Sequence, residues 1–480
     1  MNYSIRILCA TGLLVISSRS YSQDCGSLNI QLRSEIPSSC TEMTMTMRQD
    51  NIGRPYLYVA QKEGGLKIYD ISAPSSPQLV QGIPITALDS LHVMNVSQNG
   101  NYLYLALGNS FSKSQNPGMA IIDITDPVHP LVTDVYKYPV PSGGASIVKA
   151  DGNYAYLGAM TNGLVILDIS DKHKIKFVSK FLPDRNFPTA KPDTAKYNAR
   201  GMEVRDGFVY LCFDAGGFRI IDISNKLEPH EAGRYSNPEM NGRPRAYNNV
   251  VLKDSLAFVA VDYCGMEILN ISDPANIRLL SWWNPWNCTG GLNNWFTSDG
   301  HANEIDINPQ CNKIFLSTGK SDMYVVDVSN PLSPDSCEAY GGVANNIGTW
   351  GISTFRDNIY LSYICTLGIP FASNWTGVKI LTYSPCAADI PVEKPEAVAL
   401  FPNPCSQRIT VVDKNISSAI GSAHFEIENL LGMRFQAPIL AAGPTSVAFD
   451  ISTLPEGNYR LRLNNGNGAW SAKFIKSSIK

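Results

Sequence analysis

One eight-residue pattern recurs seven times along the chain, and it restricts the possible folds more than any other feature. Its clearest copies are Gly217–Ser224 (GFRIIDIS) and Gly65–Ser72 (GLKIYDIS). The other copies are Gly118–Thr125, Gly163–Ser170, Gly265–Ser272, Asp322–Ser329 and Gly377–Ser384. Apolar residues at both odd and even positions predict a strand buried on both faces. The closing Asp-Ile-Ser, often followed closely by a proline, predicts a turn.

The segments around each copy predict a unit of four antiparallel strands. A short strand, a turn such as Asn99–Asn101 and a second strand precede the pattern, and a fourth strand such as Pro130–Tyr136 follows it. The position of Asp222, which holds aspartate in five of the seven copies, returns roughly every 50 residues, a spacing typical of β-propeller blades. We therefore expect an all-β fold with a seven-bladed β-propeller.

A propeller must close its ring, and the seventh copy has no outer strand after it. Leu28–Ile36, near the N-terminus, alternates like a strand. We expect it to pair with Val378–Tyr383 as the outer strand of the last blade. Cys25 and Cys386 flank these two segments, so a disulfide between them is one possibility.

Composition and the terminal segments define the compartment and the domains. Residues 1–22 combine a basic start, the apolar run Ile7–Ile16 and a small-residue cleavage site, which predicts a signal peptide. One of the eleven cysteines lies in the signal peptide, and the ten that remain in an exported chain predict disulfides of undetermined connectivity. A net charge of −3 gives no case for nucleic acid. No other segment resembles a transmembrane span. We expect the propeller in 23–385, a linker in 386–396 and a small C-terminal β-sandwich in 397–480.

The repeat resembles the LVIVD repeat of exported bacterial and archaeal proteins. The resemblance rests on the order Gly-hydrophobic-x-Ile-hydrophobic-Asp-Ile-Ser-x-Pro and covers roughly 41–385. It implies a propeller, and it brings no catalytic motif with it.

The C-terminal segment resembles the type A sorting domain of the type IX secretion system. Its matching elements are Phe401–Pro404, Asn429–Gly432, Leu454-x-x-Gly457-x-Tyr459 and Lys473-x-x-Lys476. The motif residues are Pro402, Asn403, Pro404, Gly457, Tyr459, Lys473 and Lys476. The resemblance implies a Bacteroidota-type bacterium, the type IX machinery as a partner, and a product that is secreted or held on the outer cell surface. Whether the sorting domain is cleaved, and the product anchored or released, is left open.

Residues that differ between blades are the candidates for function. We expect the starts of the innermost strands to line the central channel, and five polar or aromatic side chains occupy those positions: His92, Arg200, Tyr247, His301 and Trp350. They could bind a ligand. Alternatively, they could fill the channel and bond to one another.

The long segment Ser281–Asp299 concentrates tryptophan, at Trp282, Trp283, Trp286 and Trp295. Two alternatives stay open for this tryptophan loop. The indoles could form a satellite core pinned by Cys288, or a platform for sugar rings or a partner protein.

No catalytic residue, metal site or cofactor is predicted, because the familiar catalytic, phosphate-binding and calcium-binding motifs do not occur. The favoured function is an exported binding module for a polysaccharide or a protein. One alternative is a hydrolase or lyase with its site in the central channel. The other is a passive structural protein of the envelope.

Overall fold

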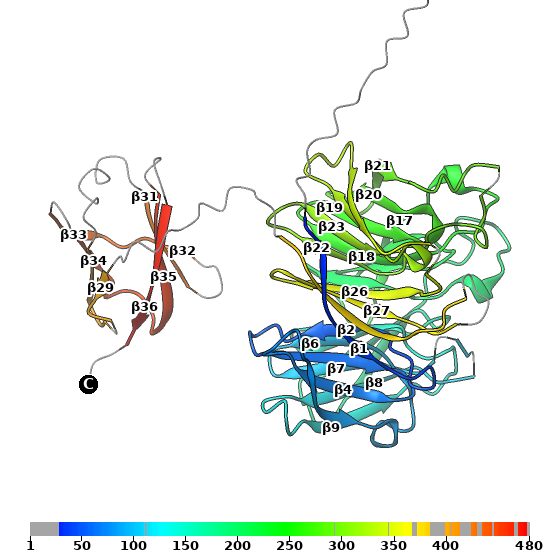
Figure 1. Ribbon diagram of the computed structural model, residues 1–480, viewed down its shortest axis with the longest axis horizontal. Coiled ribbons are helices and arrows are strands. Elements are labelled where there is room, and N and C mark those ends of the chain that lie inside the picture. The colour runs from blue at the N-terminus through cyan, green and yellow to red at the C-terminus, as the bar shows by residue number, and fades with distance from the viewer. Residues whose placement is uncertain are drawn as a thin grey trace, which may run out of the picture. The chain divides into compact units, whose positions relative to one another are not determined.

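A computed structural model describes residues 28–109, 111–112, 114–291, 293–343, 345–366, 372–384, 399–403, 405–412, 424–429, 434–443, 446–464 and 469–477. The chain divides into two compact units, Met1–Cys386 and Ala387–Lys480. Strands dominate both units (Figure 1). Within the described ranges, no helix is long and apolar enough to cross a membrane.

The first unit contains seven sheets of four antiparallel strands each. The first four blades are β2 (Met47–Gln49), β3 (Tyr56–Gln61), β4 (Gly65–Asp70), β5 (Gln78–Ile83); β6 (Val93–Asn99), β7 (Tyr102–Leu107), β8 (Gly118–Asp123), β9 (Leu131–Lys137); β10 (Ile147–Asp151), β11 (Tyr154–Gly158), β12 (Leu164–Asp168), β13 (Lys176–Phe181); and β14 (Met202–Arg205), β15 (Phe208–Cys212), β16 (Phe218–Asp222), β17 (His230–Tyr235). The last three are β18 (Tyr247–Lys253), β19 (Leu256–Val261), β20 (Met266–Asn270), β21 (Arg278–Trp283); β22 (Ile305–Asn308), β23 (Lys313–Ser317), β24 (Met323–Asp327), β25 (Asp335–Tyr340); and β26 (Thr349–Phe355), β27 (Asn358–Tyr363), β28 (Gly377–Thr382), β1 (Gln31–Pro37). The predicted seven-bladed propeller is confirmed.

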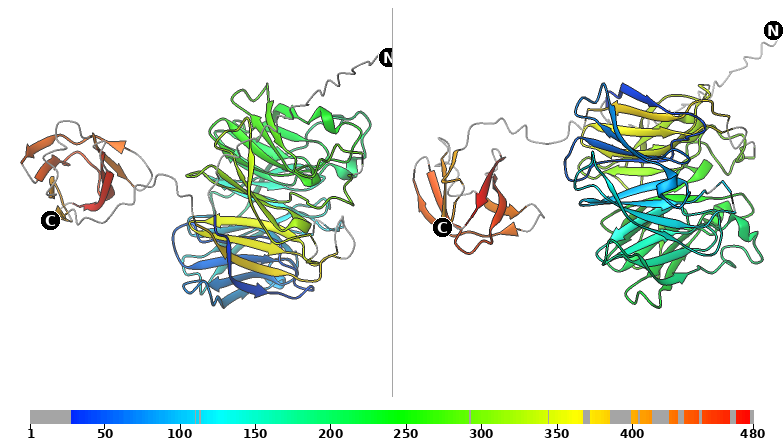
Figure 2. Two further views of the ribbon diagram at one scale, coloured as in Figure 1. Left: turned by 45° about the horizontal axis from the view of Figure 1, so that its top comes forward. Right: turned by 90° about the horizontal axis from the view of Figure 1, so that it is seen from below.

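The seven sheets form a closed ring. The first strands of successive blades contact one another in the order β2, β6, β10, β14, β18, β22 and β26, and β26 contacts β2 again. The sheets of the first and last blades accordingly lie side by side (Figure 2). The dark-blue β1 pairs antiparallel with β28, from Gln31 opposite Thr382 to Pro37 opposite Gly377 (Figure 1). The expected closure of the last blade by the N-terminal strand is therefore confirmed.

The repeated pattern is the third strand of each blade, and its residue types have structural causes. Phe218, Ile220 and Ile221 in β16 are fully buried. Gly217 has a φ of +84°, and a Cβ there would lie 2.3 Å from the carbonyl oxygen of Tyr235. At the other end of the strand, Asp222 Oδ1 accepts a hydrogen bond from the Ser224 amide at 2.8 Å. Five other copies make the same turn contact, through Asp70, Asp123, Asp168, Asn270 and Asp327.

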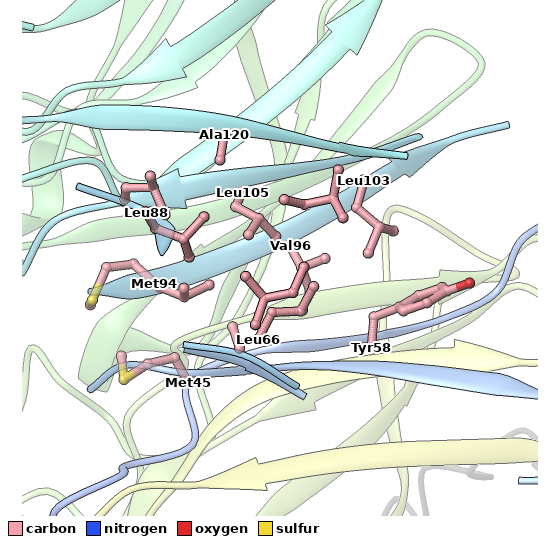
Figure 3. Packing of buried hydrophobic residues seen from close by; sticks show 14 of the residues in the cluster. Met45, Tyr58, Leu66, Leu88, Met94, Val96, Leu103, Leu105 and Ala120 are labelled. Carbon is pink, nitrogen blue, oxygen red and sulfur yellow. The ribbon is translucent and has the colours of Figure 1, made fainter. Parts of the chain in front are cut away.

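The hydrophobic cores lie between neighbouring blades. In the first, Leu66 of β4, Val96 of β6 and Leu105 of β7 are fully buried together (Figure 3). Because each core draws on two neighbouring blades, burial of apolar area, at roughly 25 cal/mol per Å², holds the blades to one another.

Disulfides join loops of the propeller. Cys40 is bonded to Cys365, and Cys264 to Cys288. Cys311 and Cys337 are also disulfide-bonded. Cys212 and Cys405 are buried free thiols. The proposed bridge between Cys25 and Cys386 falls outside the described residues.

The second unit contains two four-stranded sheets. Their strands are β29 (Ala399–Phe401), β30 (Arg408–Val412), β34 (Ser446–Asp450) and β33 (Ile439–Ala442) in one, and β32 (Arg434–Phe435), β31 (His424–Asn429), β35 (Gly457–Asn464) and β36 (Ala469–Lys476) in the other. Ile409 and Phe449 from the first sheet share a buried cluster with Leu461 and Phe474 from the second.

Candidate binding sites at the channel mouth and the tryptophan loop

Every blade contributes to a small cavity at one end of the central channel. We call this cavity the channel mouth, and it is lined by Met45, Thr46, Met94, Ser146, Arg200, Asn248, Glu304 and Trp350. Its volume is about 20 Å³, which is room for about one water molecule. Any larger ligand must therefore lie outside the channel and place only a small group in it.

Two of the five residues predicted to line the channel, Arg200 and Trp350, do so. The lining positions in other blades differ by one to three residues from those expected, for example Met94 rather than His92. Register shifts near the starts of β6 and β18 explain part of this difference, because each one-residue slip reverses the face to which a side chain points. Loops of unequal length before the inner strands add to it.

Tyr247 and His92 lie beside the channel mouth without lining it. Tyr247 is fully buried, and its hydroxyl donates a hydrogen bond to Glu267 Oε2 at 2.9 Å. The same hydroxyl oxygen accepts one from the Asn237 amide. His92 precedes β6, with its Nδ1 3.7 Å from Glu63 Oε1, and burial lowers the pKa of this imidazole.

His301 joins the channel end of blade 6 to the tryptophan loop. It is 1% exposed, and its Nδ1 lies 2.5 Å from Asp262 Oδ1. The other oxygen of Asp262 accepts a hydrogen bond from the indole N–H of Trp295 at 2.9 Å. The ring of Trp295 also packs edge-on against His301, 5.8 Å between centroids. This carboxylate fixes both rings, so the predicted channel residue and the predicted loop residue belong to one cluster.

Arg200 is held over an aromatic ring from across the channel. It precedes β14 in blade 4, and its guanidinium carbon lies 5.6 Å from the ring centroid of Trp350 in blade 7. Trp350 packs against Phe111, 5.7 Å between centroids, and the Lys62 ammonium lies 5.7 Å from the Phe111 ring. Two aromatic rings in contact, with a cation at each end, thus lie at the mouth.

Charged side chains continue down the channel. Lys149 pairs with Glu203 at 2.6 Å, and Arg48 lies 4.0 Å from Asp306. Burial raises the pKa of Glu304, while Arg48 and a hydrogen bond from Asn249 oppose that rise.

Sequence reasoning did not place Thr46, Ser146 or Asn248 in this cavity. The sequence feature that could have identified them is a polar residue at the start of an otherwise apolar inner strand. Whether such a side chain points into the channel, however, depends on the strand register.

The tryptophan loop is anchored to its blade through its indole groups. The indole N–H of Trp282 donates to the Cys264 carbonyl at 2.7 Å, and that of Trp283 donates to Ser336 Oγ at 2.9 Å. Trp286 packs edge-on against Trp283, 5.7 Å between centroids. The bond between Cys264 and Cys288 closes the loop. The anchoring leaves Trp282 and Trp286 partly exposed.

A cleft of about 460 Å³ lies in the surface of the tryptophan loop. We call it the Trp286 cleft, and its lining is Pro285, Trp286, Asn287, Gly290, Gly291, Asn293, Thr297 and Asp299. Arg243 supports its wall by donating hydrogen bonds to the carbonyls of Cys288 and Thr289. The cleft thus combines a tryptophan ring with amide, hydroxyl and carboxylate groups. No set of three metal-ligating His, Cys, Asp or Glu side chains is found in the part of the chain that is described.

The second unit has a groove at its sorting-motif residues. A cavity of about 550 Å³ is lined by Asn403, Glu428, Asn429, Asn458, Tyr459, Arg460, Phe474 and Ile475. Asn403 Oδ1 accepts a hydrogen bond from the Ile475 amide at 2.9 Å, and the Tyr459 hydroxyl donates to the Pro455 carbonyl at 2.8 Å. Lys476 is buried, whereas Pro404 falls outside the described residues. The hydrogen bond of Asn403 joins the two ends of the unit.

Comparison with protein families agrees with this architecture. The model of the LVIVD repeat matches residues 54–83, 92–137, 142–182, 198–237, 244–284 and 314–340. The model of the secretion system C-terminal sorting domain matches 399–477. The chain is an LVIVD-repeat β-propeller protein with a type IX sorting domain. It is therefore exported by type IX secretion, to the cell surface or beyond.

The LVIVD model leaves the seventh blade unmatched, and the fold explains why. The outer strand β1 of that blade comes from the N-terminus, so its four strands are not contiguous in sequence. Its third strand is also followed by Tyr383 where the other copies have isoleucine or valine. The seventh blade can still be identified from the sequence because Gly377–Ser384 keeps the eight-residue strand pattern.

Comparison with solved structures finds similar chains at low sequence identity. The β-propeller domain of Cps50 (Swd1) from Myceliophteria thermophila is similar with a TM-score of 0.51 and 13% identity, over 74% of this chain and 99% of that one. The computationally designed protein Ika8 is similar with a TM-score of 0.45 and 10% identity, over 73% and 99%. No curated protein matches the chain by sequence.

Proposed function

We propose that this protein is an exported binding module that holds polysaccharide on the loop face of its propeller, at the Trp286 cleft. The observation that carries the proposal is the composition of that cleft, in which Trp286 stands beside Asn287, Thr297 and Asp299. Sugar rings present a C–H face that packs on an indole, and hydroxyl groups that bond to amides and carboxylates. An anchored loop lowers the entropy cost of ordering these groups on binding.

A hydrolase or lyase with its site in the central channel is less well supported. Such an enzyme needs acid and base groups that converge beside a space for the substrate. Arg200 and Glu304 do line one cavity, but its volume of about 20 Å³ admits no sugar ring. The larger Trp286 cleft fits a saccharide better.

The test is binding of the mature full-length chain to an array of neutral and acidic oligosaccharides, followed by titration of the best ligand. We expect Trp286→Ala to weaken binding about tenfold or more, because a central aromatic contact commonly contributes at least 1.4 kcal/mol. Asp299→Ala, at an exposed position of the cleft, should weaken it several-fold without affecting the packing of Trp286.

The matched control is Phe296→Ala, which removes an aromatic ring that is 65% exposed on the same loop and lies outside the cleft lining. It should bind like the parent chain. If no oligosaccharide binds, or if Trp286→Ala and Asp299→Ala both bind normally while folded, the proposed function is wrong.

A further inference from the structure

Arg200 presents a charged group with unused donors at the channel mouth. A guanidinium has five N–H donors in a planar fork. In the described part of the chain, no protein oxygen accepts a hydrogen bond from the Arg200 side chain, and no carboxylate lies within ion-pair distance of it. The nearby cations Lys149 and Arg48, by contrast, each lie beside an acidic partner. Among the described residues, the close contact that holds the guanidinium is the ring of Trp350.

Two further buried polar groups line the same cavity. Thr46 is 7% exposed and Asn248 is 4% exposed. The Thr46 hydroxyl and the Asn248 side-chain carbonyl are buried, and neither has a hydrogen-bond partner among the described residues. The amide nitrogen of Asn248 is fixed by the Ala302 carbonyl at 2.8 Å, so the side chain keeps its orientation. A buried hydroxyl without a partner costs free energy, and a ligand oxygen in the cavity would remove that cost for Thr46, whereas the Asn248 carbonyl is an acceptor and would bond only a ligand donor such as a sugar hydroxyl.

We infer that the channel mouth binds the carboxylate of an acidic sugar residue, a uronate, in a polysaccharide. The Arg200 fork matches the two carboxylate oxygens, and the Thr46 hydroxyl donates to one of them. The cavity has room for about one water molecule, so one carboxylate oxygen enters it, and the sugar ring lies above it against Trp350 and Phe111. Phe111 is 53% exposed, which leaves an aromatic face free for that ring.

Two neighbouring carboxylates, Glu304 and Asp214, interact electrostatically with Arg200, but neither lies within ion-pair distance of it among the described residues. Burial raises the pKa of Glu304, and it raises that of Asp214 to about 6. Glu304 also accepts a hydrogen bond from Asn249, and Asp214 accepts one from Asn198 at 2.7 Å. Arg200 thus favours the ionised form of both acids from a distance, while their hydrogen bonds go to asparagines, so the N–H donors of the fork stay available to a ligand.

A peptide C-terminus is the other common source of a carboxylate, and the fold favours it less. Peptides usually dock as an extra strand on a free sheet edge or in a nest of backbone amides. The inner strands at the channel instead pack against those of neighbouring blades, and the donors here belong to side chains. The site is separate from the Trp286 cleft, so it goes beyond the proposed function.

The experiment is calorimetric titration of the mature full-length chain with digalacturonate, its dimethyl ester and an acetylated tripeptide with a free C-terminus. We expect digalacturonate to bind, and the uncharged ester to bind at least about tenfold more weakly, as expected for loss of a charged hydrogen bond. Arg200→Gln should abolish the difference between acid and ester. Arg200→Lys should restore it only in part, because an ammonium lacks the fork.

The control variant is Arg205→Gln, which removes the same charge from the end of β14, where Arg205 stacks on Tyr210 at 5.6 Å. It should bind like the parent. If Arg200→Gln melts early, Thr46→Val tests the same site through a near-isosteric change and should weaken binding several-fold. Four outcomes would each overturn the inference. Acid and ester could bind equally, digalacturonate could fail to bind, the tripeptide could bind more tightly, or folded Arg200 or Thr46 variants could bind like the parent. If Trp286→Ala loses binding of the oligosaccharide from the array but binds digalacturonate normally, the two sites are separate.

Discussion

At the scale of single residues, the propeller core holds an acid in an unusual state. Glu267 is fully buried in β20 and accepts a hydrogen bond from the Tyr247 hydroxyl at 2.9 Å. Burial raises the pKa of Glu267 to about 7, which outweighs the hydrogen bonds that favour its ionised form. The folded protein therefore keeps this proton at pH values where the unfolded chain has lost it.

This proton makes stability depend on pH. Between the unfolded pKa near 4.5 and the folded pKa near 7, the folded state binds more protons, so the free energy of unfolding falls as pH rises and levels off above about pH 7. The shift corresponds to about 3 kcal/mol. We expect Glu267→Gln to remove this part of the pH dependence, measured as melting temperature from pH 4.5 to 8. Glu228→Gln, at an exposed turn, is the control and should keep the parent profile. A variant profile as steep as that of the parent would show that Glu267 is ionised in the folded state.

At the scale of the element, the blade depends on a glycine before its third strand. Gly217 combines a positive φ with a Cβ position 2.3 Å from the Tyr235 carbonyl, and Gly65 meets the Ile83 carbonyl at 2.0 Å in the same way. The glycine lets the third and fourth strands approach closely at the loop end of the blade. The pattern tolerates Asp322 in blade 6, where the backbone still has a φ of +56°.

Gly217→Ala should therefore destabilise the propeller by about 1–3 kcal/mol, from backbone strain and the carbonyl clash together. The measurement is thermal melting followed by circular dichroism. Gly207→Ala is the matched control, since Gly207 also has a positive φ, of +80°, with open space around its Cβ position. Equal losses in the two variants would mean that strain alone, rather than the contact with β17, decides the preference for glycine.

At the scale of the whole molecule, the ring depends on one strand from the N-terminus. β1 completes the last blade, and the bond between Cys40 and Cys365 ties the segment after it to the loop after β27. Without β1, strand β28 would expose an unpaired edge, and Val378 and Ile380 would lose the cover of Ile36.

A chain that begins at residue 38 should melt at a clearly lower temperature and aggregate more readily than one that begins at residue 28, because an open edge strand invites pairing with other chains. Both chains lack Cys25, so the comparison isolates β1. Equal melting temperatures and equal solubility would contradict the closure of the ring by this strand.

How much the sequence foretells differs between the fold and the candidate sites. The pattern around Gly217 predicts strand, blade and blade number, because two-sided burial, a positive-φ residue before the strand and a turn-capping side chain after it are local features that recur from blade to blade. The sorting domain is likewise predicted from the spacing of its motifs, because these are also local features of the sequence. The channel lining does not follow, since the register shifts at β6 and β18 arise from packing against neighbouring blades.

The sequence by itself thus determined the architecture, the closing strand and the route of export. Only the tertiary structure decided which side chains meet. It placed Arg200 over Trp350 from three blades away, turned Tyr247 toward Glu267, and joined His301 and Trp295 through Asp262. The physical reason is that each blade repeat is specified by local burial and turn chemistry. A site at the axis is instead assembled from residues far apart in the chain, and the direction in which each side chain points depends on strand register and loop length.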